Sequence, residues 1–157
     1  MTAGALDYYA LDELLTEEDR MVRATVRSFV EREALPLIEG CHAREEFPRQ
    51  LIPRLGELGL FGANLKGYGC PGLSNVAYGL IMQELEAGDS GLRSMASVQG
   101  SLAMFAIWRW GSEEQKRRWL PEMAAGRAIG CFGLTEPDHG SDPGSMETRA
   151  RRDGDGY

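Results

Sequence analysis

Apolar residues recur at helical spacing through most of this 157-residue sequence, and helix-capping and helix-ending residues divide them into separate runs. Thr16, Ser74 and Ser112 each precede such a run, where a hydroxyl can accept a hydrogen bond from an unpaired N–H of the first turn. Thr16 and Ser112 also begin sequences of the capping-box type. The pattern changes after Gly126, a residue type common at helix ends. We therefore predict helices up to Gly126 and a different structure beyond it.

Proline and glycine set the predicted helix boundaries. The first helix begins at Thr16 and should kink or end near Ala34–Leu35, because Pro36 lacks a backbone N–H and disfavours helical geometry in the residue before it. The glycine-rich stretch Gly62–Gly72 is predicted to be an ordered loop. The other predicted helices start at Pro48, Ser74, about Leu92 and Ser112, and stop near Gly59, Gly88, Trp110 and Gly126.

Residues 129–157 carry the pattern of β-structure. Ile129–Leu134 is a short apolar run, and Met146–Arg152 alternates loosely, so both are predicted strands. Asp153–Gly156 is a hairpin-turn signal that is followed only by Tyr157. Because an isolated pair of strands is marginally stable, we expect the chain to break off inside a β region of a longer parent protein.

Composition excludes several kinds of partner. The chain has 43% hydrophobic and 26% charged residues, which is ordinary for a soluble globular protein, and its net charge is −7. A net-acidic chain is unsuited to nucleic acid or to an anionic membrane surface, because both attract cations. No apolar run approaches a membrane span of roughly 20 residues. The acidic N-terminus lacks the features of a signal or transit peptide, so we expect a cytoplasmic protein.

The cysteines and histidines form no metal-binding pattern. Cys41, Cys70 and Cys131 include no CxxC pair, and His42 and His139 lack metal-ligand spacing to other ligands. An odd number of unpaired cysteines is typical of reduced thiols in a reducing compartment. We therefore predict no metal site.

The end of the first predicted strand has the composition of a ligand-binding loop. Cys131–Asp142 reads CFGLTEPDHGSD. The strand would deliver Thr135 at its end, Pro137 would fix a turn, and Gly140 would allow close approach of the backbone to a ligand. On residue chemistry alone, a capped turn between two strands is the commoner outcome for such a sequence. The loop is therefore either a polar-ligand site or a simple turn.

Three segments resemble, in order and spacing, those of the acyl-CoA dehydrogenase family. Thr135–Asp142 resembles the family's TEPxxGSD signature, which is specific at this length. Gly62–Gly72 resembles its glycine-rich loop, and Gly111–Pro121 resembles its GSEEQK…YLP segment. The resemblance extends over about residues 12–157.

The resemblance implies a mainly α fold. Residues 1–128 would form the family's N-terminal helical domain, an orthogonal helix bundle, and residues 129–157 would be the first strands of a truncated middle β domain. It also implies FAD as cofactor, an acyl-CoA substrate and an electron-transfer flavoprotein as redox partner. The full-length parent would be a homo-oligomer, a tetramer or a dimer.

By the same resemblance, the loop after the first predicted strand would line FAD. Thr135 would hydrogen-bond the pyrimidine edge of the isoalloxazine, and Gly140 and Ser141 would reach the pyrophosphate. Ser141 would also touch the CoA ester. The expected cofactor-binding residues are Phe132, Gly133, Leu134, Thr135, Glu136, Pro137, Asp138, His139, Gly140 and Ser141.

The segment Glu84–Gln99 resembles that of glutaryl-CoA dehydrogenases, in which an arginine binds the distal carboxylate of the substrate. Arg93 matches that arginine, and a guanidinium suits bidentate pairing with a carboxylate. Glu86 could hold Arg93 while the pocket is empty, because an unpaired buried charge is costly. On the residues alone, a solvated Arg93 paired with Asp89 is the alternative. The expected substrate-binding residues are Arg93, Ser94, Ser97, Glu86 and Ser141.

The resemblance implies a reaction as well. In the family a glutamate removes the α-proton of the acyl thioester while a hydride leaves the β-carbon for the flavin, and the glutaryl branch then loses CO2 to give crotonyl-CoA. That glutamate belongs to a C-terminal four-helix bundle, the third domain of the family fold, so we expect no catalytic residue in this chain and little FAD binding by the chain alone. The alternatives are a dehydrogenase for another short acyl-CoA and a non-catalytic helical interaction module.

Overall fold

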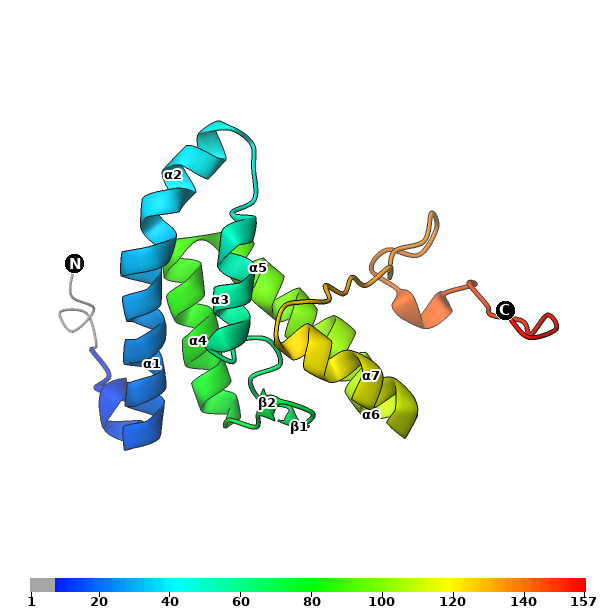
Figure 1. Cartoon of the computed structure of the whole chain (residues 1–157), viewed down its shortest axis with the longest axis horizontal. Coiled ribbons are helices and arrows are strands. Elements are labelled where there is room, and N and C mark those ends of the chain that lie inside the picture. The colour runs from blue at the N-terminus through cyan, green and yellow to red at the C-terminus, as the bar shows by residue number, and fades with distance from the viewer. Residues whose placement is uncertain (1–7) are drawn as a thin grey trace.

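The computed structural model describes residues 8–157 and is built mainly of helices (Figure 1). α1 (Glu17–Phe29) begins at the predicted capping box. The Asp19 N–H donates to Thr16 Oγ1, and the Thr16 N–H donates to Asp19 Oδ2, each at 3.1 Å. Residues 1–7 lie outside the described residues, and the stretch between them and Thr16 includes a 3-10 helix over Leu11–Leu14. The predicted start of the first helix is therefore confirmed.

The helix does not end at Pro36. A π-helical segment, Val30–Ala34, follows α1 and leads directly into α2 (Leu35–Ala43). The Leu35 N–H donates to the Val30 carbonyl, five residues back. A proline removes one helical N–H and crowds the carbonyl four residues before it, and a wider turn is one way to relieve both. Pro36 thus coincides with a local change of helix type and not with a helix end.

The next segments form a short helix and a small hairpin. A 3-10 turn, Arg49–Leu51, continues into α3 (Ile52–Glu57), and Gly59 ends the helix with a φ of 69°. Two strands of two residues each, β1 (Lys66–Gly67) and β2 (Cys70–Pro71), pair antiparallel inside the predicted loop.

Side chains fix this hairpin on the helices that follow it. Its turn residues, Tyr68 and Gly69, both have positive φ, 54° and 84°, as two-residue hairpin turns of the primed types require. The Tyr68 hydroxyl donates to the Glu113 carboxylate at 3.0 Å, and Trp108 Nε1 donates to the Lys66 carbonyl at 2.9 Å. The glycine-rich stretch is therefore ordered, as predicted, and contains a hairpin that the sequence pattern did not indicate.

The remaining helices follow the predicted caps. Ser74 caps α4 (Asn75–Gly88), and Asp89 both ends α4 and caps the next helix by accepting from the Leu92 N–H at 2.9 Å. That helix is continuous through α5 (Ser90–Ser97), a π-helical segment (Val98–Met104) and α6 (Phe105–Trp110). α7 (Glu113–Ala124) begins at the predicted Ser112 capping box.

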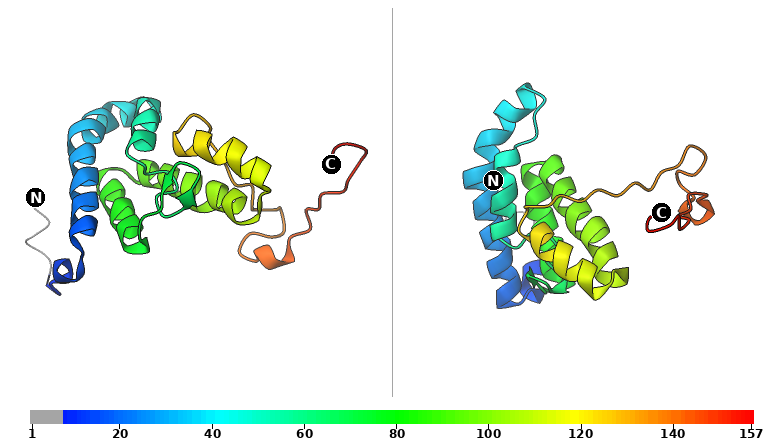
Figure 2. Two further views of the ribbon diagram at one scale, coloured as in Figure 1. Left: turned by 60° about the horizontal axis from the view of Figure 1, so that its bottom comes forward. Right: turned by 45° about the vertical axis from the view of Figure 1, so that its right-hand side comes forward.

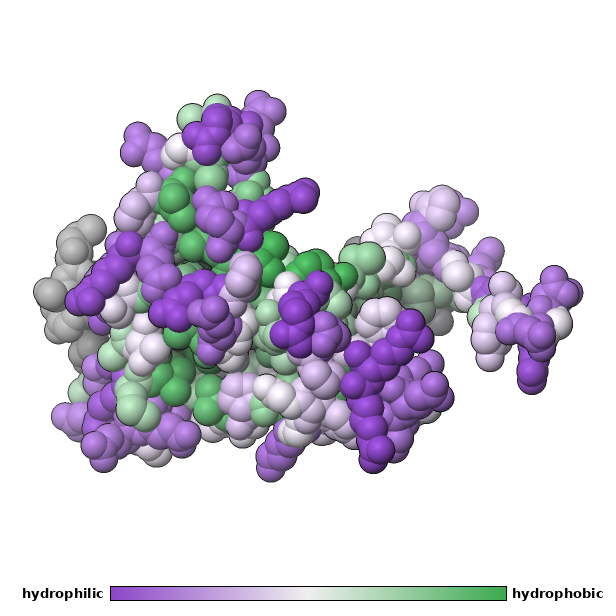
Figure 3. Space-filling model, viewed as in Figure 1, coloured by the Kyte–Doolittle hydropathy of each residue, from purple (hydrophilic) through white to green (hydrophobic). Residues whose placement is uncertain are grey.

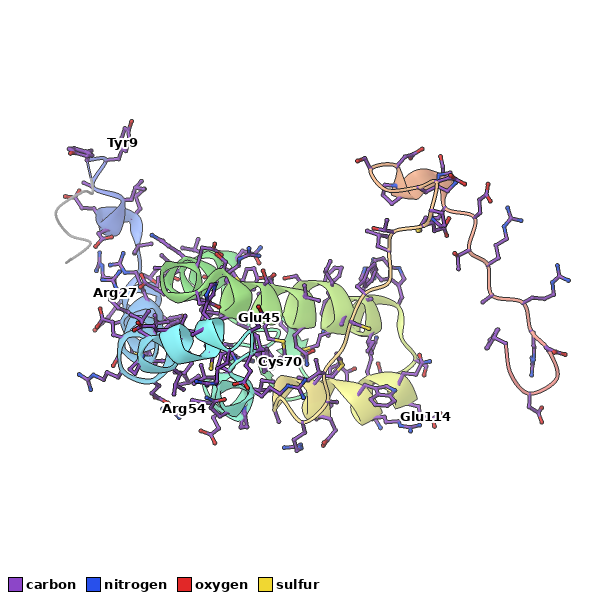
Figure 4. All side chains as sticks on the ribbon, turned by 90° about the horizontal axis from the view of Figure 1, so that it is seen from above. Tyr9, Arg27, Glu45, Arg54, Cys70 and Glu114 are labelled. Atoms are coloured by element: carbon purple, nitrogen blue, oxygen red, sulfur yellow. The ribbon has the colours of Figure 1, made fainter. Side chains whose placement is uncertain are left out.

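The core joins buried side chains of α1, α4 and α5 with those of α3, the loop after α3, the π-helical segments and α7. The largest fully buried side chains are Phe61, Leu55, Ile81, Leu85, Leu92, Met104, Leu120, Gln99 and Val26. One charged pair crosses the interface of α1 and α4: Arg27 Nε and Nη2 donate to the two oxygens of the buried Glu84 at 2.9 and 2.6 Å. Arg27 extends from α1 in Figure 4.

Beyond α7 the chain leaves the helices as an extended segment, and the three ribbon views agree on this (Figures 1 and 2). Gly126 has a φ of 72°, which is consistent with the predicted helix stop. The predicted strands Ile129–Leu134 and Met146–Arg152 are not formed as strands; within the described residues this part of the chain holds a 3-10 turn and one bridge between Asp153 and Gly156. A strand requires a neighbour for its N–H and C=O groups, and here no neighbouring strand is placed beside these segments.

None of the helices in residues 8–157 has the length and apolar character needed to cross a bilayer. The same range contains no group of three histidine, cysteine, aspartate or glutamate side chains arranged to hold a metal ion.

Candidate functional site

Arg93 and Glu86 form an ion pair between the end of α4 and the start of α5. Arg93 Nε donates to Glu86 Oε2 at 2.6 Å, and the Ser90 hydroxyl donates to Glu86 Oε1 at 2.6 Å. The side chains of Arg93 and Glu86 are 36% and 46% exposed, so solvent screens the pair and an incoming carboxylate can compete with Glu86. The alternative pairing with Asp89 is not formed, because the Asp89 carboxylate caps α5.

The two serines predicted beside Arg93 contribute unequally. Arg93 Nη1 lies 3.5 Å from Ser97 Oγ, a long contact, and the Ser97 hydroxyl donates to the Ser94 carbonyl at 3.2 Å. Ser94 therefore contributes its backbone carbonyl to this arrangement. The cluster of Glu86, Ser90, Arg93 and Ser97 is half-exposed and presents one guanidinium beside hydroxyl groups, which suits an anionic ligand.

Hydrogen bonds from Arg93 and then from Ser90 hold the pKa of Glu86 below its ordinary value of 4.5. A depressed pKa stabilises the folded chain above the unfolded-state pKa, and this contribution is lost as the pH falls through the folded-state pKa.

We expect Arg93→Ala to raise the pKa of Glu86 toward 4.5 in an NMR titration of the carboxyl carbon. Arg32→Ala, at an exposed position, should leave it unchanged. An unmoved Glu86 pKa in Arg93→Ala would contradict this pairing.

The predicted cofactor segment lies on the extended chain after α7. Phe132 and Leu134 are 44% and 39% exposed. Within residues 8–157, the backbone groups of 131–135 make no hydrogen bond to other backbone groups. A Cβ atom added at Gly133 or Gly140 would meet nothing within 4 Å, and neither glycine has a positive φ. This segment therefore offers free N–H and C=O groups beside apolar side chains, and its glycines are not required by packing.

The second half of the segment is a turn that backbone hydrogen bonds close and that the Glu136 side chain ties to the chain beyond it. The backbones of Glu136 and His139 exchange two hydrogen bonds of 3.2 Å. The Glu136 carboxylate accepts from the N–H groups of Glu147 and Thr148 at 2.8 and 2.7 Å. Hydrogen bonding from Thr148, and then from Glu147, keeps the pKa of Glu136 below its usual range. Of the predicted cofactor-binding residues, Glu136 thus has a structural use in shaping the loop.

The structure brings one predicted group together and leaves the other apart. Glu86, Arg93 and Ser97 meet at the α4–α5 junction. Ser141, predicted to touch both ligands, lies on the extended segment, which runs away from α5 in Figure 2. Among the described residues, no hydrogen bond or ion pair links Ser141 to the Arg93 cluster.

Sequence reasoning missed Gln99, which is 1% exposed. Its side chain contacts the backbone at the start of the extended segment, beside an apolar hollow of about 360 Å³ lined in part by Ile107, Trp119 and Phe132. Figure 3 shows apolar residues near this exit and mainly hydrophilic residues farther along the segment. The one available signal was a glutamine within an apolar helical run.

Comparison with known proteins identifies the class. The profile of the family described as "Acyl-CoA dehydrogenase, N-terminal domain" matches residues 16–127, most of the chain. The chain therefore belongs to the acyl-CoA dehydrogenase family, and the predicted mainly α fold is confirmed.

Three relatives show how similar the chain is to members of this family. The structure is similar to that of a glutaryl-CoA dehydrogenase from Mycobacterium smegmatis in complex with FADH2, with a TM-score of 0.90 and 56% identity over 95% of this chain and 39% of that one. A second structure of glutaryl-CoA dehydrogenase from Mycobacterium smegmatis has a TM-score of 0.86 and 61% identity, over 92% of this chain and 38% of that one. The mitochondrial short-chain specific acyl-CoA dehydrogenase of Bos taurus is 37% identical, over 91% of this chain and 35% of its own length. The chain thus spans little more than a third of these relatives.

Proposed function

We propose that this chain is the N-terminal part of an FAD-dependent acyl-CoA dehydrogenase that oxidises glutaryl-CoA to crotonyl-CoA and CO2. The assignment of the substrate rests on the guanidinium of Arg93, which is half-exposed and held by Glu86 and Ser97. The distal carboxylate of a glutaryl group would replace Glu86 as its partner, in the bidentate manner of arginine. The similarity to two glutaryl-CoA dehydrogenase structures supports the same substrate.

The residues of the extended segment fit an isoalloxazine ring. The ring has a polar pyrimidine edge and an apolar benzenoid end, and the segment offers free backbone N–H and C=O groups beside exposed Phe132 and Leu134. In our proposal Thr135 binds the pyrimidine edge, and the open glycine backbone at Gly140, with Ser141, binds the pyrophosphate. FAD, when bound, supplies the hydride acceptor. Residues 1–128 and residues 129–157 would then belong to two domains of the parent enzyme.

The part of the reaction assigned to this chain is positioning. Arg93 anchors the distal carboxylate, so that the α and β carbons of the acyl chain lie at a set distance from its guanidinium. We assign no described residue as the base for the α-proton. Cytoplasmic location, electron transfer to an electron-transfer flavoprotein and homo-oligomerisation are parts of the same proposal, and the three free cysteines are compatible with a reducing compartment.

A second candidate is a dehydrogenase for a short monocarboxylic acyl-CoA. The observation that favours it is the 37% identity to the Bos taurus enzyme, whose name specifies short chains. For such a substrate Arg93 would stay paired with Glu86 and would have no part in binding.

Anaerobic titration of the full-length protein tests this function. We expect glutaryl-CoA to bleach the flavin absorbance and butyryl-CoA to do so poorly. Arg93→Ala should weaken the response to glutaryl-CoA about tenfold or more, the cost of one lost charge-assisted pair, and leave the response to butyryl-CoA unchanged. Arg32→Ala is the matched control, because it removes an exposed arginine elsewhere.

The other outcomes separate the candidates. Bleaching by butyryl-CoA alone would retain the dehydrogenase and reject glutaryl-CoA. The absence of bleaching with either ester would favour the non-catalytic helical module.

A further inference from the structure

Gln99 is a buried amide whose polar atoms are bonded to backbone. Nε2 donates to the carbonyls of Met123 and Ala128 at 3.0 and 2.8 Å, and Oε1 accepts from the Gly130 N–H at 2.8 Å. A glutamine suits this place because it offers two donors and an acceptor in one group. Buried polar networks that are fully satisfied hold their members in one arrangement.

These bonds join three parts of the fold. Gln99 belongs to the continuous helix that also carries Arg93 and Ser97. Met123 is in the last turn of α7, and Ala128 and Gly130 begin the extended segment. Gln99 therefore connects the helix of the proposed substrate site directly to the chain that enters the proposed flavin segment.

Packing closes the same junction from two sides. A Cβ atom at Gly130 would lie 2.5 Å from Ala103 Cβ and 2.7 Å from Met123 Cε, so the backbone there is pressed against the helix and α7. Next to Gln99 in the helix, a Cβ atom at Gly100 would lie 2.7 Å from the Gly62 nitrogen. The position of the segment at Gly130 is thus set by close packing and by the Gln99 amide together.

We propose that Gln99 is a positioning residue: it sets the place of the flavin-binding segment relative to Arg93, and so the distance between the flavin and a substrate anchored at its distal end. This inference rests on the proposed function. We call the hydrogen bonds of Gln99 to Met123, Ala128 and Gly130 the clamp. Phe132 is two residues beyond Gly130, so a displacement of the backbone at the clamp would also displace the flavin-binding segment. Misplacement of about 1 Å can reduce a reaction rate about a hundredfold.

Two variants release the clamp by different means. Gln99→Met keeps the side-chain length but removes the donors and the acceptor, and Gly130→Ala leaves Gln99 intact and displaces the segment by steric contact. Their controls are Gln83→Met, at an exposed position of α4, and Gly79→Ala, where an added Cβ meets nothing within 4 Å. If one clamp variant fails to fold, the other still tests the proposal.

The first measurement is amide hydrogen exchange on this chain. We expect the Gly130 amide to exchange about tenfold faster or more in Gln99→Met than in the unsubstituted chain, because its acceptor is gone. Core amides of α4 should keep their protection, and Gln83→Met should change neither. Unchanged exchange at Gly130 would overturn the clamp.

The second measurement is stopped-flow flavin reduction in the full-length holoenzyme. For both clamp variants we expect the rate per bound flavin at saturating glutaryl-CoA to fall about tenfold or more, while the Kd for glutaryl-CoA stays within about twofold, because Arg93 is untouched. A purely structural role would lower the amount of folded enzyme and not the rate per bound flavin. An unchanged rate per bound flavin, with Gly130 exchange accelerated, would overturn the positioning role. Failure of the unsubstituted enzyme to be reduced by glutaryl-CoA would instead reject the proposed function.

Discussion

Phe61→Ala should lower the free energy of unfolding by about 3–5 kcal/mol, the usual cost of truncating a buried phenylalanine. Phe61 is fully buried and belongs to the main core. Its ring lies beside Gly126, just after the end of α7. A Cβ atom at Gly126 would be 3.2 Å from Phe61 Cε2. Its backbone lies beside Gly100 in the continuous helix. The cavity would therefore open where three parts of the fold meet, with little freedom for them to collapse into it.

Urea unfolding of the 157-residue chain measures this effect. Phe132→Ala is the control, because Phe132 is 44% exposed on the extended segment, and its truncation should change the stability by less than about 0.5 kcal/mol. Equal losses for the two variants would mean that Phe61 is not in a rigid core.

Glu84→Ala should destabilise the fold by about 3 kcal/mol, because it leaves the Arg27 guanidinium without its bidentate partner at the interface of α1 and α4. The side chain of Glu84 is 6% exposed and that of Arg27 is 35% exposed, which places the effect at the lower end of the range for buried pairs. The hydrogen bonds that Arg27 donates to the Glu84 carboxylate are also the main cause of the raised pKa of Arg27.

Glu86→Ala provides a matched control on the same helix, two residues away. Its ion pair with Arg93 is solvent-exposed, and exposed pairs contribute roughly 0–1 kcal/mol. Thermal and urea unfolding should therefore rank Glu84→Ala well below Glu86→Ala in stability. If both lost the same small amount, water would already be compensating Arg27.

The helix starts were predictable because their causes are local. A hydroxyl at Thr16 or Ser112 needs only an N–H three residues ahead, and the structure forms both capping boxes. Pro36 shows the limit of this reasoning. Its missing N–H predicts a kink or an end near Ala34–Leu35, but the helix does not end there and passes through a π-helical segment into α2.

The candidate site was only partly accessible to sequence. Resemblance singled out Arg93 and Glu86, and the structure joins them by an ion pair. The flavin roles of Phe132–Ser141 remain predictions. The segments that flank Arg93 and those near Thr135 are separated by tens of residues, so no pattern along the chain states how far apart they lie.

The sequence by itself determined where helices begin, where Gly59 and Gly126 stop them, and which helix faces are apolar. It could do so because capping, glycine at helix ends and polar–apolar periodicity depend on interactions within a few residues. Tertiary structure decided the rest. Ile129–Leu134 has a strand-like sequence but is no strand where no neighbouring strand lies beside it. Gln99 became a clamp because Met123, Ala128 and Gly130, 24 to 31 residues further along, are brought to its amide. Hydrogen bonds between distant residues form only once packing has brought them together, and for that reason sequence periodicity does not reveal them.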